Sequence, residues 1–145
     1  MSKHLEGIQR IIRGELPTPP VPRLIGFQLT SVRHGEAEIE LEATDMHANP
    51  MGTLHGGILC DIADAAMGIA FASTLEDGES FTTLELKINF LRPVWKDKLR
   101  AVGKVVKRGK SVGMVECDVT NSQGALVARS SSTCMVLRGE QASGR

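Results

Sequence analysis

The sequence predicts an α+β fold in which one curved antiparallel sheet of about six strands wraps around a single long helix. The first observation is the stretch from Asn49 to Leu75, where apolar residues recur at three- and four-residue steps and almost no charge interrupts them. A helix that is apolar on nearly every side belongs inside a protein. The second observation is that strand-like segments on both sides of this helix are joined by short turns, so neighbouring strands must run antiparallel.

The segment before the central helix begins with a short amphipathic helix over residues 3–13. Four prolines then predict an extended connector, so residues 1–23 form an N-terminal helix and Pro-rich connector. A two-stranded unit follows, with its turn near His34 and Gly35. In its second arm Ala37, Ile39 and Leu41 alternate with glutamates, which indicates one face toward the core and one toward water.

Four more strands follow the central helix. The clearest covers residues 83–90, where Leu84, Leu86, Ile88 and Phe90 alternate with polar residues before Pro93 closes the segment. The others are expected at about 98–106, 112–120 and 125–137, separated by turn residues at 108–110 and 121–124. The main domain therefore covers residues 24–138, and residues 139–145 are expected to form a flexible tail.

Composition excludes several classes of protein. The 145 residues carry 17 basic and 17 acidic side chains, so there is no basic field for nucleic acid. The three cysteines have no CxxC spacing and fall in apolar segments, which indicates reduced core residues. No signal peptide and no run of about 18 apolar residues is present, so we expect a cytoplasmic protein without a membrane span.

Two features of the central helix suggest chemistry. Its start carries Gly56 and Gly57, and backbone N–H groups at a Gly-rich helix start can bind an oxyanion or polarise a carbonyl. Its apolar body carries Asp61 and Asp64, and carboxylates are costly in such surroundings unless they have a function or a partner. His47, His55, Asp61 and Asp64 do not follow the usual spacing of metal ligands, so no metal is expected. No other cofactor is expected either.

The run from Asn49 to Gly57, which reads NPMGTLHGG, with Asp64 nine residues after His55, resembles the active-site segment of hotdog-fold acyl-CoA thioesterases. The resemblance covers residues 24–138 and points to the PaaI-like and thioesterase superfamily member 2-like branch. It implies that Gly56 offers its N–H to the thioester carbonyl and that Asp64 acts as base or nucleophile. It further implies supporting roles for His55, Asn49 and Thr83.

The geometry of a helix adds a prediction about assembly. Gly56 and Asp64 are eight residues apart, which is roughly 12 Å along a helix axis at ~1.5 Å per residue. One carbonyl cannot contact both, so Asp64 must come from a second subunit whose helix runs in the opposite sense. We therefore expect a homodimer with two composite sites, and the resemblance implies that dimers pair into a homotetramer.

The expected substrate is an aryl- or medium-chain acyl-CoA, hydrolysed to the free acid and CoA. Several residues are expected to contact it: Gly57, Met51, Leu54, Ile58 and Phe81, with Met67 from the partner, at the acyl group, and Arg92, Arg108 and Lys110 at the CoA phosphates. Two alternatives remain open: a non-catalytic acyl-CoA-binding protein and an enoyl-CoA hydratase. Asp61 competes with Asp64 for the catalytic position, since residues three apart share a side of a helix.

Overall fold

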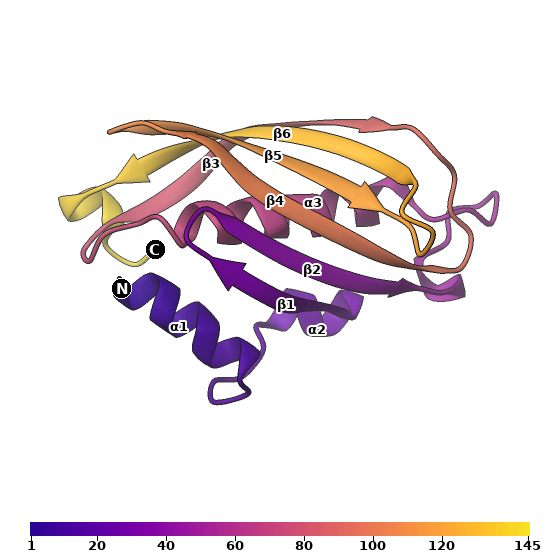
Figure 1. Ribbon diagram of the computed structural model, residues 1–145, viewed down its shortest axis with the longest axis horizontal. Coiled ribbons are helices and arrows are strands. Elements are labelled where there is room, and N and C mark those ends of the chain that lie inside the picture. Colours follow the sequence, from indigo (N-terminus) through magenta and orange to yellow (C-terminus); the bar gives the residue numbers. More distant parts are fainter.

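The computed structural model describes all 145 residues and has the predicted α+β architecture. A six-stranded antiparallel sheet in the order β1-β2-β4-β5-β6-β3 curves over helix α3, as Figure 1 shows. The strands are β1 Phe27–Arg33, β2 Glu36–Ala43, β3 Ser80–Phe90, β4 Asp97–Arg108, β5 Val112–Thr120 and β6 Leu126–Leu137. The helices are α1 Lys3–Ile12, α2 Pro20–Ile25 and α3 Gly56–Ala72, with short 3-10 turns η1 Asp45–His47 and η2 Gly139–Ala142.

Helix α3 lies against the concave face of the sheet and contacts mainly β4, β2 and β5. The close approach of α3 to the sheet requires glycine at position 103 of β4. A side-chain carbon there would lie 2.8 Å or less from the backbone of Ala66 and Met67. The core consists of this helix and the inward residues of all six strands, and Ile62, Ala66 and Met67 are completely buried.

The N-terminal segment differs from the sequence-based expectation at its connector. The connector was expected to be extended, but Pro20–Ile25 form helix α2, with proline at its first turn. Proline fits there because its ring sets a helical φ and the missing N–H would have had no partner in the helix. Gly26, at φ 96°, ends the helix by donating its N–H to the carbonyl of Pro22.

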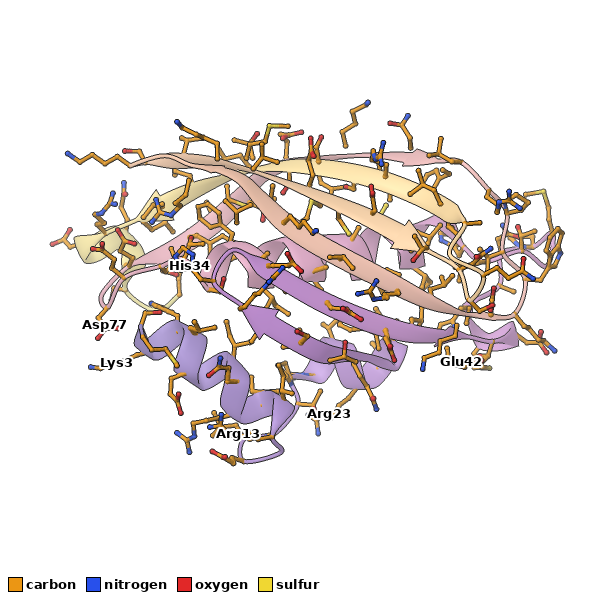
Figure 2. The ribbon with its side chains drawn as sticks, viewed as in Figure 1. Lys3, Arg13, Arg23, His34, Glu42 and Asp77 are labelled. Carbon is orange, nitrogen blue, oxygen red and sulfur yellow. The ribbon has the colours of Figure 1, made fainter.

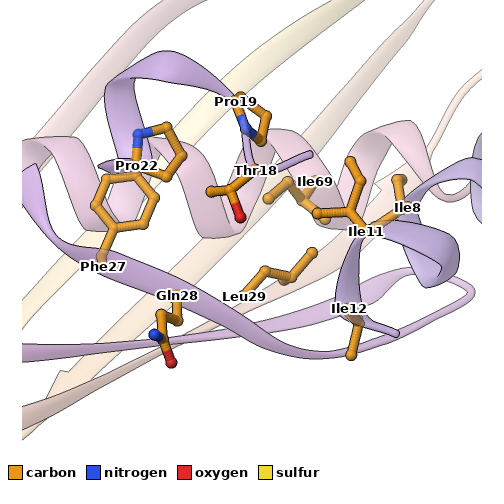
Figure 3. A pocket seen from close by; sticks show the side chains of 10 residues that line it. All are labelled: Ile8, Ile11, Ile12, Thr18, Pro19, Pro22, Phe27, Gln28, Leu29 and Ile69. Atoms are coloured by element: carbon orange, nitrogen blue, oxygen red, sulfur yellow. The ribbon is translucent and has the colours of Figure 1, made fainter. Parts of the chain in front are cut away.

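Helix α1 packs against β1, and its N-terminus is attached near the start of β3. The backbone N–H of Lys3 donates to Asp77 Oδ1 at 2.9 Å, and both residues lie at the same end of the molecule in Figure 2. Between α1, the connector, β1 and α3 an apolar cavity of about 370 Å³ is left (Figure 3), lined in part by Ile8, Leu29 and Ile69.

Strand β3 is an edge strand with a β-bulge. Thr83 pairs with Cys134 of β6 and Glu85 pairs with the preceding Thr133, so Leu84 is an extra residue. The sequence predicted one unbroken alternation that placed Leu84 and Leu86 together on the core face. The bulge corrects this: Thr83 and Leu86 both pair with inward residues of β6, and the Leu84 side chain is 54% exposed.

Candidate active site

The start of helix α3 is capped by the side chain of His55. His55 Nδ1 accepts the backbone N–H of Gly57 at 2.8 Å, and the backbone N–H of His55 donates to the carbonyl of His47 at 2.9 Å. A helix leaves its first N–H groups without intrahelical partners. His55 accepts the N–H of Gly57, whereas the N–H of Gly56, at the helix start, has no hydrogen-bond partner in the chain.

The loop before the helix is held by Asn49. Its Oδ1 accepts the backbone N–H groups of Met51 at 2.9 Å and Thr53 at 3.2 Å, and its Nδ2 donates to Thr53 Oγ1 at 2.7 Å. The backbone N–H of Leu54 then donates to the carbonyl of Val94 at 2.7 Å. These bonds fix the loop beside the segment that follows β3.

A cavity of about 480 Å³ opens where this loop, the helix start and the segment after β3 meet. It brings together four of the residues that the sequence singled out, Asn49, Leu54, Gly56 and Arg92. Its complete lining is Asn49, Thr53, Leu54, Gly56, Leu59, Phe90, Leu91, Arg92, Pro93 and Val94. This volume is within the range of pockets that hold small molecules, and Gly56, whose N–H is free, forms part of the wall.

Asp64 lies two turns further along α3, outside this cavity. Burial, and secondly the negative charge of Asp61, raise the pKa of Asp64 above that of an ordinary aspartate. The Asp64 charge also helps to raise the pKa of the Cys134 thiol, whose largest cause is burial. Thr83 Oγ1 lies 3.8 Å from Cys134 Sγ, so the thiol that responds to the charge of Asp64 is a neighbour of Thr83.

Other expected site residues lie elsewhere in the single chain. Met67 is completely buried in its own core, so the expectation that it reaches a partner's acyl pocket is wrong. Phe81 packs on Phe71 with ring centroids 5.4 Å apart and lies beside Gly68, in the second half of α3. Met51 is 84% exposed on the loop, and the N–H of Gly57 is already used by His55.

The three basic candidates have different surroundings. The Arg108 guanidinium donates to Glu79 Oε2 at 2.9 Å and to Thr74 Oγ1 at 3.1 Å, and it lies over the Phe71 ring. Arg108 is therefore held at the C-terminal end of α3 and does not line the 480 Å³ cavity. It is not among the proposed phosphate contacts. Lys110 lies in the exposed β4–β5 turn, and Arg92 is exposed at the rim of the 480 Å³ cavity.

Side chains that could bind a metal are dispersed: nowhere do three or more His, Cys, Asp or Glu residues gather into a suitable group. None of the helices has both the length and the apolar character needed to cross a membrane.

Comparison with known proteins decides the family. The thioesterase superfamily matches residues 51–128, which include the helix start, Asp64 and the whole of β3. The chain belongs to the thioesterase superfamily. The expectations of a PaaI-like member, of a thioester hydrolase and of the hotdog fold are thereby confirmed.

Individual superfamily members resemble the chain over most of its length. The 1,4-dihydroxy-2-naphthoyl-CoA hydrolase of Listeria monocytogenes is 31% identical over 77% of this chain and 91% of its own. The structure of a phenylacetic acid degradation-related protein from Ralstonia eutropha JMP134 is 36% identical, with a TM-score of 0.79 and coverage of 88% and 97%. Escherichia coli PaaI, at 24% identity, shares the fold with a TM-score of 0.82, covering 95% of this chain and 96% of its own.

One residue of the cavity lining, Phe90, was not predicted as a site residue from the sequence. Phe90 was expected in the core; it lies on the expected face of its strand, but it is 55% exposed and lines the cavity, against Gly56. The available signal was its place at the end of a strand, directly before the Leu91-Arg92-Pro93 segment that was already associated with the site.

Proposed function

We propose that the chain is an acyl-CoA thioesterase that hydrolyses an aryl- or medium-chain acyl-CoA to the free acid and CoA. The observation that carries the proposal is the unpaired N–H of Gly56, which is held at a capped helix start in the wall of a cavity of suitable size. The Listeria relative, whose name specifies an aryl-CoA substrate, supports this class of substrate.

Gly56 is suited to hold the thioester carbonyl. Its N–H lies at the positive end of the α3 dipole and has no competing acceptor within the chain. Negative charge develops on the carbonyl oxygen when a nucleophile attacks, and one fixed donor aimed at that oxygen is worth ~3 kcal/mol in comparable sites. His55 and Asn49 support this donor by fixing the turn that presents it.

Asp64 is the proposed base or nucleophile. As a base, it takes a proton from water while the water oxygen bonds to the carbonyl carbon; the C–S bond then breaks, and the thiolate sulfur of CoA receives a proton. Its raised pKa makes the carboxylate a stronger base than an ordinary aspartate. Thr83, on the inner face of β3, is the proposed supporting hydroxyl.

We propose that Asp64 of one chain serves the Gly56 site of a second copy. The two residues lie eight positions apart on α3, roughly 12 Å along its axis at ~1.5 Å per residue. Strand β3 offers the surface for pairing, because it is a free edge of the sheet and exposes Leu84. A two-fold dimer would build two composite sites, and dimers are expected to pair into a tetramer.

Arg92 and Lys110 are the proposed contacts to the CoA phosphates.

The test is thiol release from phenylacetyl-, benzoyl-, hexanoyl- and lauroyl-CoA by the wild type, Asp64→Asn and Asp61→Asn. We expect Asp64→Asn to lower kcat at least a hundredfold and Asp61→Asn to retain most activity, since the carboxylate with the raised pKa is Asp64. Light scattering of each protein gives the oligomeric state.

Three outcomes contradict parts of the proposal. Saturable acyl-CoA binding without thiol release by the wild type identifies an acyl-CoA-binding protein. Hydration of an enoyl-CoA without thiol release identifies a hydratase. A fully active monomer at high dilution excludes the composite site, whatever the substrate.

A further inference from the structure

Phe90 occupies an unusual position for a large aromatic side chain. It is the last residue of β3 and pairs with Ala128 of β6, so its backbone is fixed on the sheet. Its side chain is nevertheless 55% exposed and forms part of the cavity that contains Gly56. Half-exposed aromatic residues in a cavity wall are available to contact a ligand.

The tip of the Phe90 ring fills the space that a side chain at position 56 would need. A Cβ added to Gly56 would lie 3.0 Å from Phe90 Cζ, 3.3 Å from Cε1 and 3.4 Å from Cε2. The backbone of Gly56 does not have a positive φ, so its conformation alone does not require glycine. An alanine at position 56 would therefore require the aromatic ring beside it to shift by a few tenths of an ångström.

The same ring limits what can be attached to a carbonyl bound at Gly56. A carbonyl oxygen that accepts the Gly56 N–H lies about 2.9 Å from the nitrogen, next to the Cα that the ring tip covers. In the pose that we infer, the carbon attached to that carbonyl passes close to the ring. A flat or linear acyl group has room to do so, whereas a branch on that carbon would meet the ring.

We propose that Phe90 sets the acyl specificity of this site by excluding groups branched at the carbon next to the thioester carbonyl. The substrate class is thus an acyl-CoA that is linear or flat at that carbon. This inference rests on the proposed thioesterase function and names a residue and a substrate restriction that the function alone does not require.

The test compares kcat/KM for two matched substrate pairs, hexanoyl- with 2-methylhexanoyl-CoA and phenylacetyl- with 2-phenylpropanoyl-CoA. The wild type is expected to prefer the unbranched member of each pair. Phe90→Ala is expected to reduce this preference about tenfold or more, because one methyl group in a pocket is worth about 10- to 200-fold in kcat/KM. Phe90→Leu, which keeps an apolar side chain, should give an intermediate ratio.

Met114→Ala is the matched control, since Met114 is also a partly exposed apolar residue on a strand but does not line the cavity. Its substrate ratios should equal those of the wild type. A second measurement tests the contact itself: Gly56→Ala keeps the backbone N–H, and we expect it to slow hydrolysis far more in the wild type than in the Phe90→Ala background.

Each result has a defined meaning. If the wild type hydrolyses the unbranched thioesters but Phe90→Ala and Phe90→Leu leave both ratios unchanged, the specificity role is overturned while the proposed function stands. Equal effects of Gly56→Ala in both backgrounds overturn the steric contact. No thiol release by the wild type from any substrate overturns both proposals.

Discussion

The pKa of Asp64 depends on two features of its surroundings on helix α3. Asp61 and Asp64 are both on the solvent-accessible side of α3 in the single chain. Burial nevertheless raises the pKa of Asp64, and the charge of Asp61 raises it further. The order of these causes matters, because burial persists when Asp61 is replaced, whereas the charge effect does not.

A pH profile therefore distinguishes the two residues. If Asp64 acts as a base, activity falls as pH drops through its pKa, because only the carboxylate can accept a proton. Asp61→Asn removes a negative charge that raises this pKa, so the acid limb of kcat/KM should move to lower pH while kcat at neutral pH changes less than threefold. An acid limb that stays in place after this substitution contradicts the assignment of Asp64.

Sequence reasoning could not separate these two acids, since their spacing places both on one side of the helix. Only the resemblance favoured Asp64, and the structure adds that the pKa of Asp64 is raised. Met67 shows a second limit of prediction from the sequence. Its apolar character was compatible with an acyl pocket, but the residue is completely buried in its own chain. Apolar residues of a central helix cannot be divided between core and pocket until the sheet that covers them is placed.

At the scale of elements, the helix start depends on a cap that a histidine supplies. The side chain of His55 accepts the Gly57 N–H, while Asn49 holds the preceding loop through two backbone N–H groups. These two side chains leave the Gly56 N–H free and fixed. We therefore propose that His55 is a positioning residue, which agrees with the supporting role that the resemblance implies.

The cap can be tested by rescue. His55→Ala should destabilise the protein by about 1 kcal/mol, as loss of an N-cap does, and should lower kcat about tenfold or more because the oxyanion donor loses its alignment. Asparagine is a good N-cap residue, so His55→Asn should recover most of both properties. Recovery of stability without recovery of kcat would instead indicate that the imidazole takes part in the reaction.

Most elements were predictable because each has a strong local pattern. Strand β5 was expected at the residues where it occurs, and β2, β4 and β6 differ only at their ends. Helix α2 was missed because four prolines favour extended backbone, and whether one proline instead starts a helix depends on the Gly26 turn that follows. The bulge in β3 was missed because the alternation of Leu86 to Phe90 extends without a break to Leu84.

At the scale of the whole molecule, an ion-pair network around the buried Glu79 joins the ends of three strands. Glu79, 9% exposed just before β3, accepts hydrogen bonds from Arg108 at the end of β4 and from Arg138 after β6, at 2.9 and 2.6 Å. Burial raises the pKa of Glu79, but the backbone N–H of Glu76 and the two arginines outweigh it, so this pKa is lowered overall.

This network predicts how stability depends on pH. A carboxyl whose pKa is lowered in the folded state stabilises the protein above its unfolded pKa, about 4.3 for glutamate, and this contribution is lost as pH falls through the folded value. Glu79→Gln should therefore lower Tm by roughly 5 °C at pH 7, corresponding to about 1.5 kcal/mol. The difference from wild type should shrink toward zero in acid, as differential scanning fluorimetry at several pH values can measure. A constant difference at all pH values would show that the charge of Glu79 is not involved.

The bulge in β3 reverses the alternation of inward and outward side chains along the strand. Before Leu84, Phe81 and Thr83 face inward; after Glu85, Leu86, Ile88 and Phe90 do so, and the extra residue absorbs the change of phase. Removing Leu84 would keep every inward residue inward, since Thr83 and Leu86 would then alternate regularly about Glu85. Removing one residue from the regular stretch between Leu86 and Phe90, with the bulge kept, would instead turn either Thr83 or Phe90 to the opposite face. Tolerance to a shorter chain between these two residues is thus concentrated at the bulge, which lies between the side chains that we assign to the reaction and to the choice of acyl group.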